Sequence, residues 1–273
     1  MHVVVTGGSG FLGSRLTRQL LAAGSQPAAG RAARPVSRVT LIDRAPAAPD
    51  LSADARVAVI RGELGDLLDP GSVGLELLDG AEVIFHLAAA VSGECETDFD
   101  LGLRANLRAT ESLLACCRAL GTSPVVVYSS SVAVFGGSAE QPLPAVITDD
   151  TRPNPQTSYG TQKVIGEYLL ADYTRKGFLN GRAVRLMTVS VRPGRPNAAA
   201  SGFLSGIIRE PLSGQRAVCP VDPGTEVALA SPAKAVGALL CAASSSDRAA
   251  RLGLVPDPDF DSVIRMHLAE TGS

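Results

Sequence analysis

Short apolar runs alternate with longer amphipathic segments along the first two thirds of the chain. Each run is rich in β-branched residues and flanked by glycine or polar residues, which is typical of a strand buried on both faces of a sheet. Between the runs, leucine and other apolar residues recur at the spacing of one helix face. The expected strands span 3–5, 39–43, 56–61, 82–87, 125–128 and 182–191, and two long helices span 101–120 and 157–175. This alternation predicts an α/β fold with a doubly wound parallel sheet of the Rossmann type.

A glycine-rich turn separates the first strand from leucines at helical spacing. Gly7, Gly10 and Gly13 stand three residues apart in this turn. Glycine adopts the unusual dihedral angles of such a turn and lets the backbone approach a pyrophosphate closely. The following helix offers free N–H groups and the positive end of its dipole to the phosphates. Strand, glycine turn and helix together predict a dinucleotide site.

The second strand ends in an acid, Asp43. A carboxylate at this place binds both hydroxyls of an adenosine ribose and repels a 2′-phosphate, which favours NAD over NADP. Arg44 would soften that preference, and an ordinary strand-end acid is the alternative interpretation. The segment 25–37, rich in Ala, Pro, Gly and Arg, is expected to be a surface loop. It places Asp43 farther along the sequence from the glycine turn than is usual for this acid. Asp66, after the third strand, is expected to reach the adenine edge.

Small and polar residues follow the next two strands. Ala88 follows the fourth strand, where a small side chain lets a ligand lie against the strand end, and the serines from Ser129 to Ser131 follow the fifth. The carboxyl ends of parallel strands meet at one edge of the sheet, where ligands bind. We therefore expect these residues, the glycine turn and the acid of the second strand at one rim. His86 is interpreted as a packed strand-end histidine, and Asn106 as a brace for the site.

Tyr159 and Lys163 stand four residues apart in a segment with helical periodicity, so both are expected on one helix face. A neighbouring ammonium favours the phenolate form of tyrosine and lowers its pKa. A tyrosine tuned in this way takes a proton from an alcohol or gives one to a carbonyl. Lysine is rare here, with three among 25 basic residues, so a compact ammonium is favoured over an arginine fork. Alone, the spacing also fits a surface pair; beside a dinucleotide site and a serine cluster, it predicts redox chemistry.

Composition excludes several other classes of function. The net charge of −2 leaves no basic footprint for nucleic acid or an acidic membrane, and aromatic residues make up only 4%. The five cysteines form no C-x-x-C pair, so we expect reduced thiols in a cytoplasmic protein without a metal site. The chain opens directly on a strand and holds no apolar run of 18 residues, so neither a signal peptide nor a membrane span is expected.

These motifs together resemble the extended branch of the short-chain dehydrogenase/reductase superfamily, which includes nucleotide-sugar epimerases. The resemblance covers nearly the whole chain. It rests on Gly7-x-x-Gly10-x-x-Gly13, His86-Leu87-Ala88-Ala89, Ser129-Ser130-Ser131 with Phe135-Gly136, and Tyr159-x-x-x-Lys163.

The resemblance implies roles for named residues. Ser131, Tyr159 and Lys163 are expected to be catalytic, with Ser131 chosen because it lies four residues before Phe135. The residues expected to bind NAD are Gly7, Gly10, Phe11, Leu12, Asp43, Asp66, Leu87, Ala88, Ala89, Asn106, Ser129, Tyr159 and Lys163. Those expected at the substrate are Ser92, Ser131, Tyr159, Thr188, Arg192 and Asn197, with Arg192 as first candidate for a carboxylate clamp.

Finer features are similar to one subgroup, the D-erythronate dehydrogenases. They include the segments 133–137, 158–163, 191–200, 206–211 and 218–221. This similarity implies oxidation of the C2 hydroxyl of a four-carbon sugar acid by NAD. Two features depart from the subgroup: Met187 stands where proline is usual, and the subgroup has several tens of further residues between about 244 and 251.

Three other functions stay open at this stage. The first is a nucleotide-sugar epimerase or dehydratase, for which the roughly 80 residues after Val191 make a small cap. The second is a dehydrogenase for another small hydroxy acid, such as a threonine-type enzyme, and the third is a non-catalytic NAD sensor. Residues 1–190 are expected to form the NAD-binding domain and residues 191–273 a small substrate cap that returns to the core. A homodimer is expected through the helices at 101–120 and 157–175.

Overall fold

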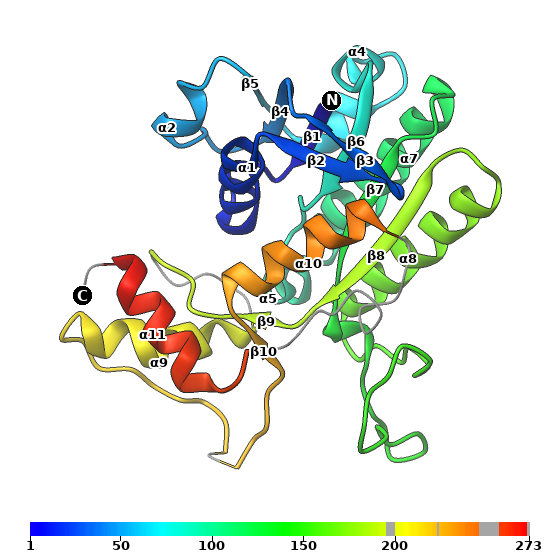
Figure 1. Ribbon diagram of the computed structural model, residues 1–273. Helices are drawn as coiled ribbons and strands as arrows, with labels where there is room; N and C mark the ends of the chain where they lie inside the picture. The colour runs from blue at the N-terminus through cyan, green and yellow to red at the C-terminus, as the bar shows by residue number, and fades with distance from the viewer. Residues whose placement is uncertain (195–199, 223, 246–256, 272–273) are drawn as a thin grey trace.

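A parallel sheet of six strands forms the centre of the computed structural model, which describes residues 1–194, 200–222, 224–245 and 257–271 (Figure 1). The strand order is β5-β4-β1-β6-β7-β8, and every neighbouring pair is parallel. The strands are β1 (His2–Thr6), β4 (Arg38–Asp43), β5 (Val57–Arg61), β6 (Ala81–His86), β7 (Val125–Ser131) and β8 (Asn180–Leu186). The chain moves outward from β1 in both directions, so a crevice opens at the carboxyl ends of β1 and β6. This confirms the predicted doubly wound sheet.

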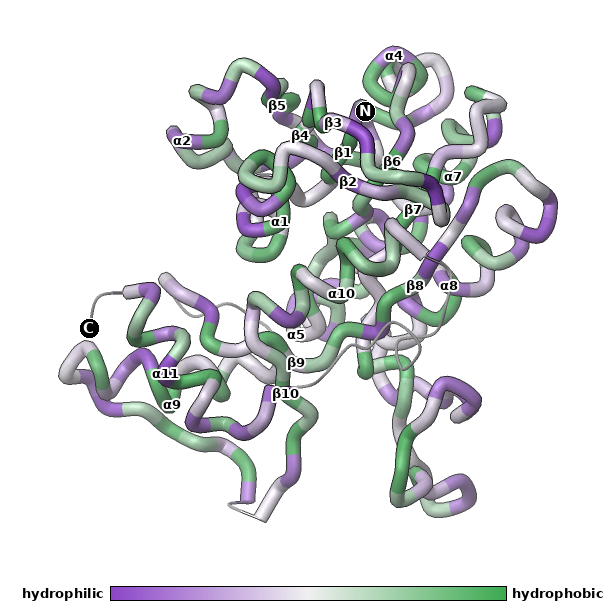
Figure 2. The backbone as a smooth tube through the Cα atoms, viewed as in Figure 1, coloured by the Kyte–Doolittle hydropathy of each residue, from purple (hydrophilic) through white to green (hydrophobic). Residues whose placement is uncertain are grey.

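Helices cover both faces of the sheet, because alternate residues of each strand face opposite sides. Val3 and Val5 of β1 pack in one hydrophobic cluster with Leu16 and Leu239, whereas Val4 packs in the other. Burying each such leucine contributes about 1.5–3 kcal/mol. Figure 2 shows hydrophobic and hydrophilic residues alternating along the helices, as expected for helices with one buried face. The first face carries α1 (Phe11–Ala23) and α10 (Pro232–Ser244); the second carries α3 (Leu64–Leu68), α4 (Gly74–Leu78), α7 (Ala109–Leu120) and α8 (Ser158–Arg175).

The expected loop at 25–37 contains an antiparallel hairpin, β2 (Ser25–Ala28) and β3 (Arg31–Pro35). Its backbone caps the end of α10: the N–H groups of Ala29 and Gly30 donate to the carbonyls of Ala243 and Ser244. The loop prediction was therefore wrong. The polar partners that order the hairpin come from a helix more than 200 residues later, which local composition does not reveal.

Two other predicted elements differ in detail. The sixth strand ends at Leu186, and β9 (Thr188–Val189) pairs with β10 (Leu229–Ala230) in a separate small sheet. The helix expected at 101–120 is three consecutive helical segments, α6 (Phe99–Gly102), a π-helical stretch η1 (Leu103–Arg108) and α7. Single π turns inside helices frequently occur at functional sites.

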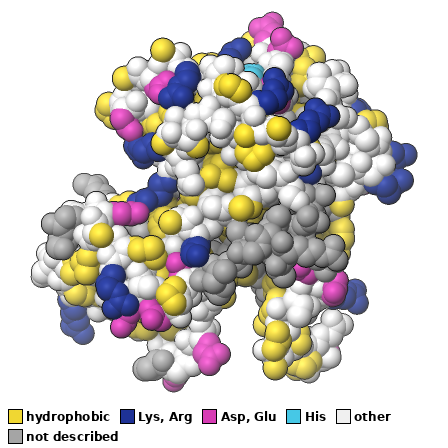
Figure 3. Space-filling view, viewed as in Figure 1, with side chains coloured by type: hydrophobic (Ala, Val, Ile, Leu, Met, Phe, Trp, Pro, Cys, Tyr) yellow, Lys and Arg dark blue, Asp and Glu magenta, His cyan; other side chains and the backbone are white. Residues whose placement is uncertain are grey.

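The remaining helices lie near the carboxyl edge of the sheet. Figure 1 shows α9 and α11 together, apart from the sheet, whereas α10 lies against it. These shorter elements are α2 (Pro49–Ser52), α5 (Ser92–Thr97), η2 (Val132–Val134), η3 (Ala200–Gly202), α9 (Phe203–Leu212) and α11 (Phe260–Thr271). On the side of the molecule seen in Figure 3, lysine and arginine side chains are scattered without a continuous basic patch. Across the described ranges, no helix combines the length and apolar character needed to cross a membrane.

Candidate active site

The glycine turn packs directly against the end of β6. Gly7 has a φ of +69°, and a Cβ there would lie 2.8 Å from the amide nitrogen of Ala88. A Cβ on Gly13 would lie 2.1 Å from the carbonyl oxygen of Gly7. Both positions therefore require glycine, and the backbone of the turn is exposed to whatever binds at the strand ends.

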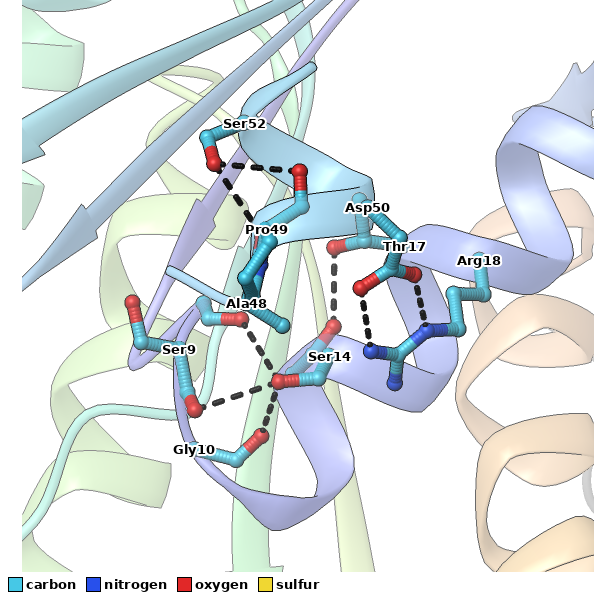
Figure 4. A network of polar contacts seen from close by, with 11 residues as sticks. Ser9, Gly10, Ser14, Thr17, Arg18, Ala48, Pro49, Asp50 and Ser52 are labelled. Atoms are coloured by element: carbon cyan, nitrogen blue, oxygen red, sulfur yellow. Dashed lines mark hydrogen bonds and ion pairs between the residues drawn. The ribbon is translucent and has the colours of Figure 1, made fainter. Parts of the chain in front are cut away.

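Polar contacts of Ser14 and Arg18 fix the position of α1 relative to the glycine turn and to α2 (Figure 4). The Ser14 hydroxyl donates to the carbonyls of Gly10 at 2.8 Å and Ser9 at 3.1 Å. Arg18 forms two hydrogen bonds with Asp50 of α2, at 2.6 and 2.9 Å, and so ties α1 to the segment after β4. No side chain caps the N-terminus of α1, and no acid stands in its first turn. Its free N–H groups and positive dipole end suit a phosphate.

Asp43 reaches the glycine turn despite the long hairpin before it. Its carboxylate accepts hydrogen bonds from the backbone N–H groups of Ser9 and Ala45, each at 3.0 Å. The acid is thus held at the carboxyl end of β4, beside the turn, and each oxygen keeps a further lone pair for a ribose hydroxyl. Asp66 lies exposed in α3. The glycine cradle, the uncapped helix and the fixed acid fit a dinucleotide such as NAD.

A cavity of about 510 Å³ opens at this edge of the sheet. It brings together most of the predicted site residues: Gly7, Gly10, Phe11, Leu12, Leu87, Ala89, Ser92, Ser129, Ser131, Tyr159, Lys163, Thr188 and Arg192. Met187 lines it too. Four predicted residues do not line it: Asp43, Asp66, Ala88 and Asn106. Asn197 lies outside the described residues.

Tyr159 is half-buried at the start of α8, where the Thr157 hydroxyl caps the helix by accepting the Gly160 N–H at 3.0 Å. Burial raises the pKa of the Tyr159 phenol, because the charged phenolate loses its hydration. A hydrogen bond with Ser131 and the positive charge of Arg192 act against that rise and lower the pKa. The serine and the tyrosine predicted to act together therefore meet in one cavity.

Lys163 is fixed by the end of β7. Its ammonium donates to the Ser129 carbonyl at 2.7 Å and lies 5.5 Å from the centroid of the Tyr159 ring. Burial lowers the pKa of Lys163 to about 8. The predicted tuning of the Tyr159 phenol by this lysine stays a prediction. The ammonium is fixed by the Ser129 carbonyl and lies beside the Tyr159 ring.

Arg192 provides the cation that faces the phenol. Its backbone N–H donates to the Ser205 hydroxyl at 2.9 Å, and its guanidinium carbon lies 6.0 Å from the centroid of the Phe11 ring. Within the described part of the chain, the guanidinium forms no hydrogen bond or ion pair with another side chain. Burial lowers the pKa of Arg192, and the interaction with Tyr159 opposes that shift. A half-buried guanidinium in such a cavity suits a carboxylate.

Asn106 and His86 have structural partners. The Asn106 side chain accepts the Ala90 N–H at 2.7 Å and donates to Gln162 at 2.8 Å, so it braces the segment after β6 without lining the cavity. Its predicted contact with the cofactor stays a prediction. The two ring nitrogens of His86 pair with the hydroxyls of Thr6 and Thr110, and burial lowers its pKa to about 3. His86 is a packed histidine, as predicted.

The three serines face different partners. The Ser129 hydroxyl donates to the His86 carbonyl at 3.0 Å, as expected for a backbone contact. The Ser130 hydroxyl donates to the carboxylate of Glu167, although backbone or cofactor was expected. Glu167 also pairs with Arg185, and sequence reasoning missed both residues. The sequence does indicate the place of Glu167, because this residue lies four positions after Lys163 and hence on the same helix face.

With this geometry in view, comparison with known proteins assigns the class. The model of the NAD dependent epimerase/dehydratase family matches residues 3–228. Over 240 residues, the chain is 53% identical to D-erythronate dehydrogenase from Cupriavidus necator, covering 88% of this chain and 71% of that protein. D-erythronate dehydrogenase from Haemophilus influenzae is 43% identical over 233 residues, which cover 85% of this chain and 69% of the relative.

A solved structure gives the same class. The nucleoside-diphosphate-sugar epimerase from Agrobacterium tumefaciens superposes with a TM-score of 0.85 at 37% identity, covering 100% of this chain and 95% of that one. The protein belongs to the NAD dependent epimerase/dehydratase family. It is accordingly an NAD-dependent oxidoreductase, and its cofactor is NAD.

Proposed function

We propose that this protein oxidises the C2 hydroxyl of D-erythronate, giving the 2-oxo acid. The observation that carries the proposal is the meeting of Ser131, Tyr159 and Arg192 in one cavity at the rim of the sheet. A hydroxyl donor, a titratable phenol and a free guanidinium are the groups that an α-hydroxy acid requires. The names of the two relatives with 53% and 43% identity support this substrate.

The glycine turn and the start of α1 would hold the pyrophosphate of NAD, and Asp43 would hold the adenosine ribose. Leu87, Ala89 and Ser129 line the cavity beyond them. When bound, NAD supplies a hydride acceptor for the substrate carbon. This arrangement fits the preference for NAD, because the fixed carboxylate of Asp43 would repel a 2′-phosphate.

Proton transfer belongs to the protein. Tyr159 removes the proton of the C2 hydroxyl while the C2–H bond breaks and the hydrogen leaves with the bonding pair as hydride, so that the oxygen's freed pair forms the new carbonyl. Ser131 donates a hydrogen bond to the reacting oxygen and stabilises its developing charge. Lys163 is held by the Ser129 carbonyl and contributes positive charge beside the Tyr159 ring. It also lines the cavity where the nicotinamide ribose would lie.

Arg192 would bind the carboxylate of the sugar acid. Its guanidinium lies near Phe11 and Tyr159, so a carboxylate held there would place the adjacent C2 hydroxyl toward the phenol. Ser92 and Thr188 line the same cavity and would contact the remaining hydroxyls. Asn197 keeps its proposed role as a further hydroxyl contact from the sequence.

A nucleotide-sugar epimerase is the second candidate, and one observation favours it: the epimerase from Agrobacterium tumefaciens, at 37% identity over the whole chain. Redox-neutral turnover of a UDP-sugar would support that function. Net production of NADH with a sugar acid would exclude it as the main activity.

We further propose a division into an NAD-binding domain, residues 1–190, and a substrate cap, residues 191–273, whose α10 returns to the sheet. A cytoplasmic homodimer through α7 and α8 is proposed as well. Five free cysteines and the exposed apolar residues Ile165 and Tyr168 on α8 support it. Leu113 and Leu114 of α7 are buried in the core and do not contribute to it.

Replacing Tyr159 with phenylalanine tests the proposed function. The Tyr159→Phe variant removes the proton acceptor but keeps the ring, so kcat should fall by about 10²–10⁴-fold. The affinity for NAD, measured by calorimetry, should stay within a factor of about two to three because the dinucleotide contacts are untouched. Turnover that survives this change would remove Tyr159 from its assigned role.

A further inference from the structure

Three residues of α8 face the three serines at the end of β7. Tyr159, Lys163 and Glu167 stand four residues apart, so their side chains lie along one face of the helix. Tyr159 and Ser131 line one cavity, where Ser131 lowers the pKa of the phenol, and Lys163 donates to the Ser129 carbonyl. Glu167 accepts the hydroxyl of Ser130 at 2.5 Å. The first two contacts belong to the proposed active site, and the third has no part in it so far.

Arg185 fixes the carboxylate of Glu167. Ser130 and Arg185 are direct neighbours across the β7–β8 ladder. Arg185 donates to both carboxylate oxygens of Glu167, at 3.0 and 2.7 Å. The Glu167 side chain is 11% exposed and that of Arg185 is 26% exposed, so solvent screens this pair only in part. Bidentate geometry and burial make Glu167 a rigid partner for Ser130.

The same arginine also holds the segment after the serines. The guanidinium carbon of Arg185 lies 4.9 Å from the centroid of the Phe135 ring. Ser131 therefore lies between two anchored residues, Ser130 and Phe135. Its own hydroxyl accepts the N–H of Ala133 at 3.1 Å, and a Cβ on Gly160 would lie only 2.2 Å from the Ala133 carbonyl. The short segment from Ser130 to Phe135 has little room to shift against α8.

We propose that Glu167, clamped by Arg185, is a positioning residue that sets the Ser131 hydroxyl against the Tyr159 phenol. This inference rests on the proposed active site, since it gives Glu167 a purpose only if Ser131 and Tyr159 act together. Glu167 touches neither substrate nor reacting atoms; it acts through the backbone between Ser130 and Ser131. A displacement of about 1 Å in such a group can lower a rate by about 100-fold.

The test compares Glu167→Ala, Glu167→Gln and Ser130→Ala with a matched control, Arg56→Met. The control removes another partly buried ion pair, Arg56 with Asp54 at the start of β5, away from the cavity. Steady-state kinetics with D-erythronate and NAD, corrected for the folded fraction, give kcat and the two KM values. Crystal structures of the wild type and the Glu167 variants, each with NADH, give the distance from Ser131 Oγ to Tyr159 Oη.

The positioning role predicts a specific pattern. Glu167→Ala should lower kcat by about 10- to 100-fold and leave KM for NAD unchanged. Glu167→Gln keeps an acceptor for Ser130, so its kcat should be higher than that of Glu167→Ala. The kcat of Ser130→Ala should lie between those of the two Glu167 variants, and Arg56→Met should change only the melting temperature. The oxygen–oxygen distance should lengthen in Glu167→Ala.

An unchanged kcat per folded molecule and an unchanged oxygen–oxygen distance in Glu167→Ala would overturn the inference. If the wild type does not oxidise D-erythronate, the proposed function fails instead. The three crystal structures still decide the role of Glu167 in that case, because they show the serine–tyrosine geometry without any substrate.

Discussion

Burial and charge oppose each other at Tyr159. Burial raises the pKa of the phenol, while Ser131 and Arg192 lower it. A general base works best when its pKa lies near the operating pH, so the lowering contacts are the ones that make this tyrosine useful. Lys163, whose own pKa falls to about 8, is held by a carbonyl and supports the site from beside the ring. Arg192 thus serves two purposes, as substrate clamp and as the charge facing the base.

The Arg192→Met variant tests both purposes. Loss of the charge-assisted hydrogen bonds to the carboxylate should raise KM for D-erythronate by about 10- to 100-fold. Arg192 lowers the pKa of Tyr159, so its removal raises that pKa. Since the base must be deprotonated, the rising limb of the profile of log kcat against pH should move to higher pH. If the rising limb stays at the same pH, measured at saturating substrate, Arg192 does not lower the pKa of Tyr159.

At the scale of elements, the close approach of α8 to β7 builds the site. Gly160 packs on the Ala133 carbonyl, and a Cβ on Gly166 would lie 2.5 Å from the Tyr128 hydroxyl oxygen. These contacts set the distance at which Tyr159 and Lys163 meet the serines. Both positions therefore require glycine because a side chain there would push α8 away from the serines.

Two glycine substitutions separate this effect from helix propensity. Gly160→Ala places a methyl group 2.2 Å from a carbonyl oxygen, so α8 must shift and the protein should lose about 1–3 kcal/mol of stability as well as most activity. Gly237→Ala, in α10, meets nothing within 4 Å and should stabilise by about 0.5–1 kcal/mol. Urea unfolding and kinetics compare the two. Equal activity in both variants would mean that the approach of α8 is not needed.

Local patterns predicted what depends on local sequence. The strands, the glycine turn and the four-residue spacing of Tyr159 and Lys163 follow from periodicity, and the structure contains them. The hairpin at 25–35 could not be predicted, because its partners lie at the end of α10. The spacing of Glu167 from Lys163 indicates its helix face, but its partner Ser130 and the role of Arg192 toward the phenol depend on contacts between elements.

For the whole molecule, the fold places chemistry at one edge of the sheet and leaves the outer face of α8 uncovered. Ile165 and Tyr168 on that face are 37% and 64% exposed. Large exposed apolar side chains at helical spacing indicate a contact surface. This is the surface that the proposed homodimer would bury.

A charge on that surface tests the proposed assembly. Tyr168→Glu would place a carboxylate in an apolar contact, where its desolvation is costly, so the dimer should dissociate. Leu75→Glu is the control, since Leu75 is also exposed, at 46%, but lies on α4. In sedimentation velocity, Tyr168→Glu should sediment as a monomer, whereas the wild type and Leu75→Glu should sediment as dimers. A wild-type protein that sediments as a monomer would refute the dimer directly.

The central claim is that this rim oxidises a four-carbon sugar acid with NAD. The most direct measurement is the absorbance of NADH after the protein is mixed with NAD⁺ and D-erythronate, beside its L isomer, the threonates and a UDP-sugar. The account predicts rapid formation of NADH with D-erythronate and none with the UDP-sugar. No NADH with any of the sugar acids, from protein whose NAD binding is confirmed by a thermal shift, would contradict it.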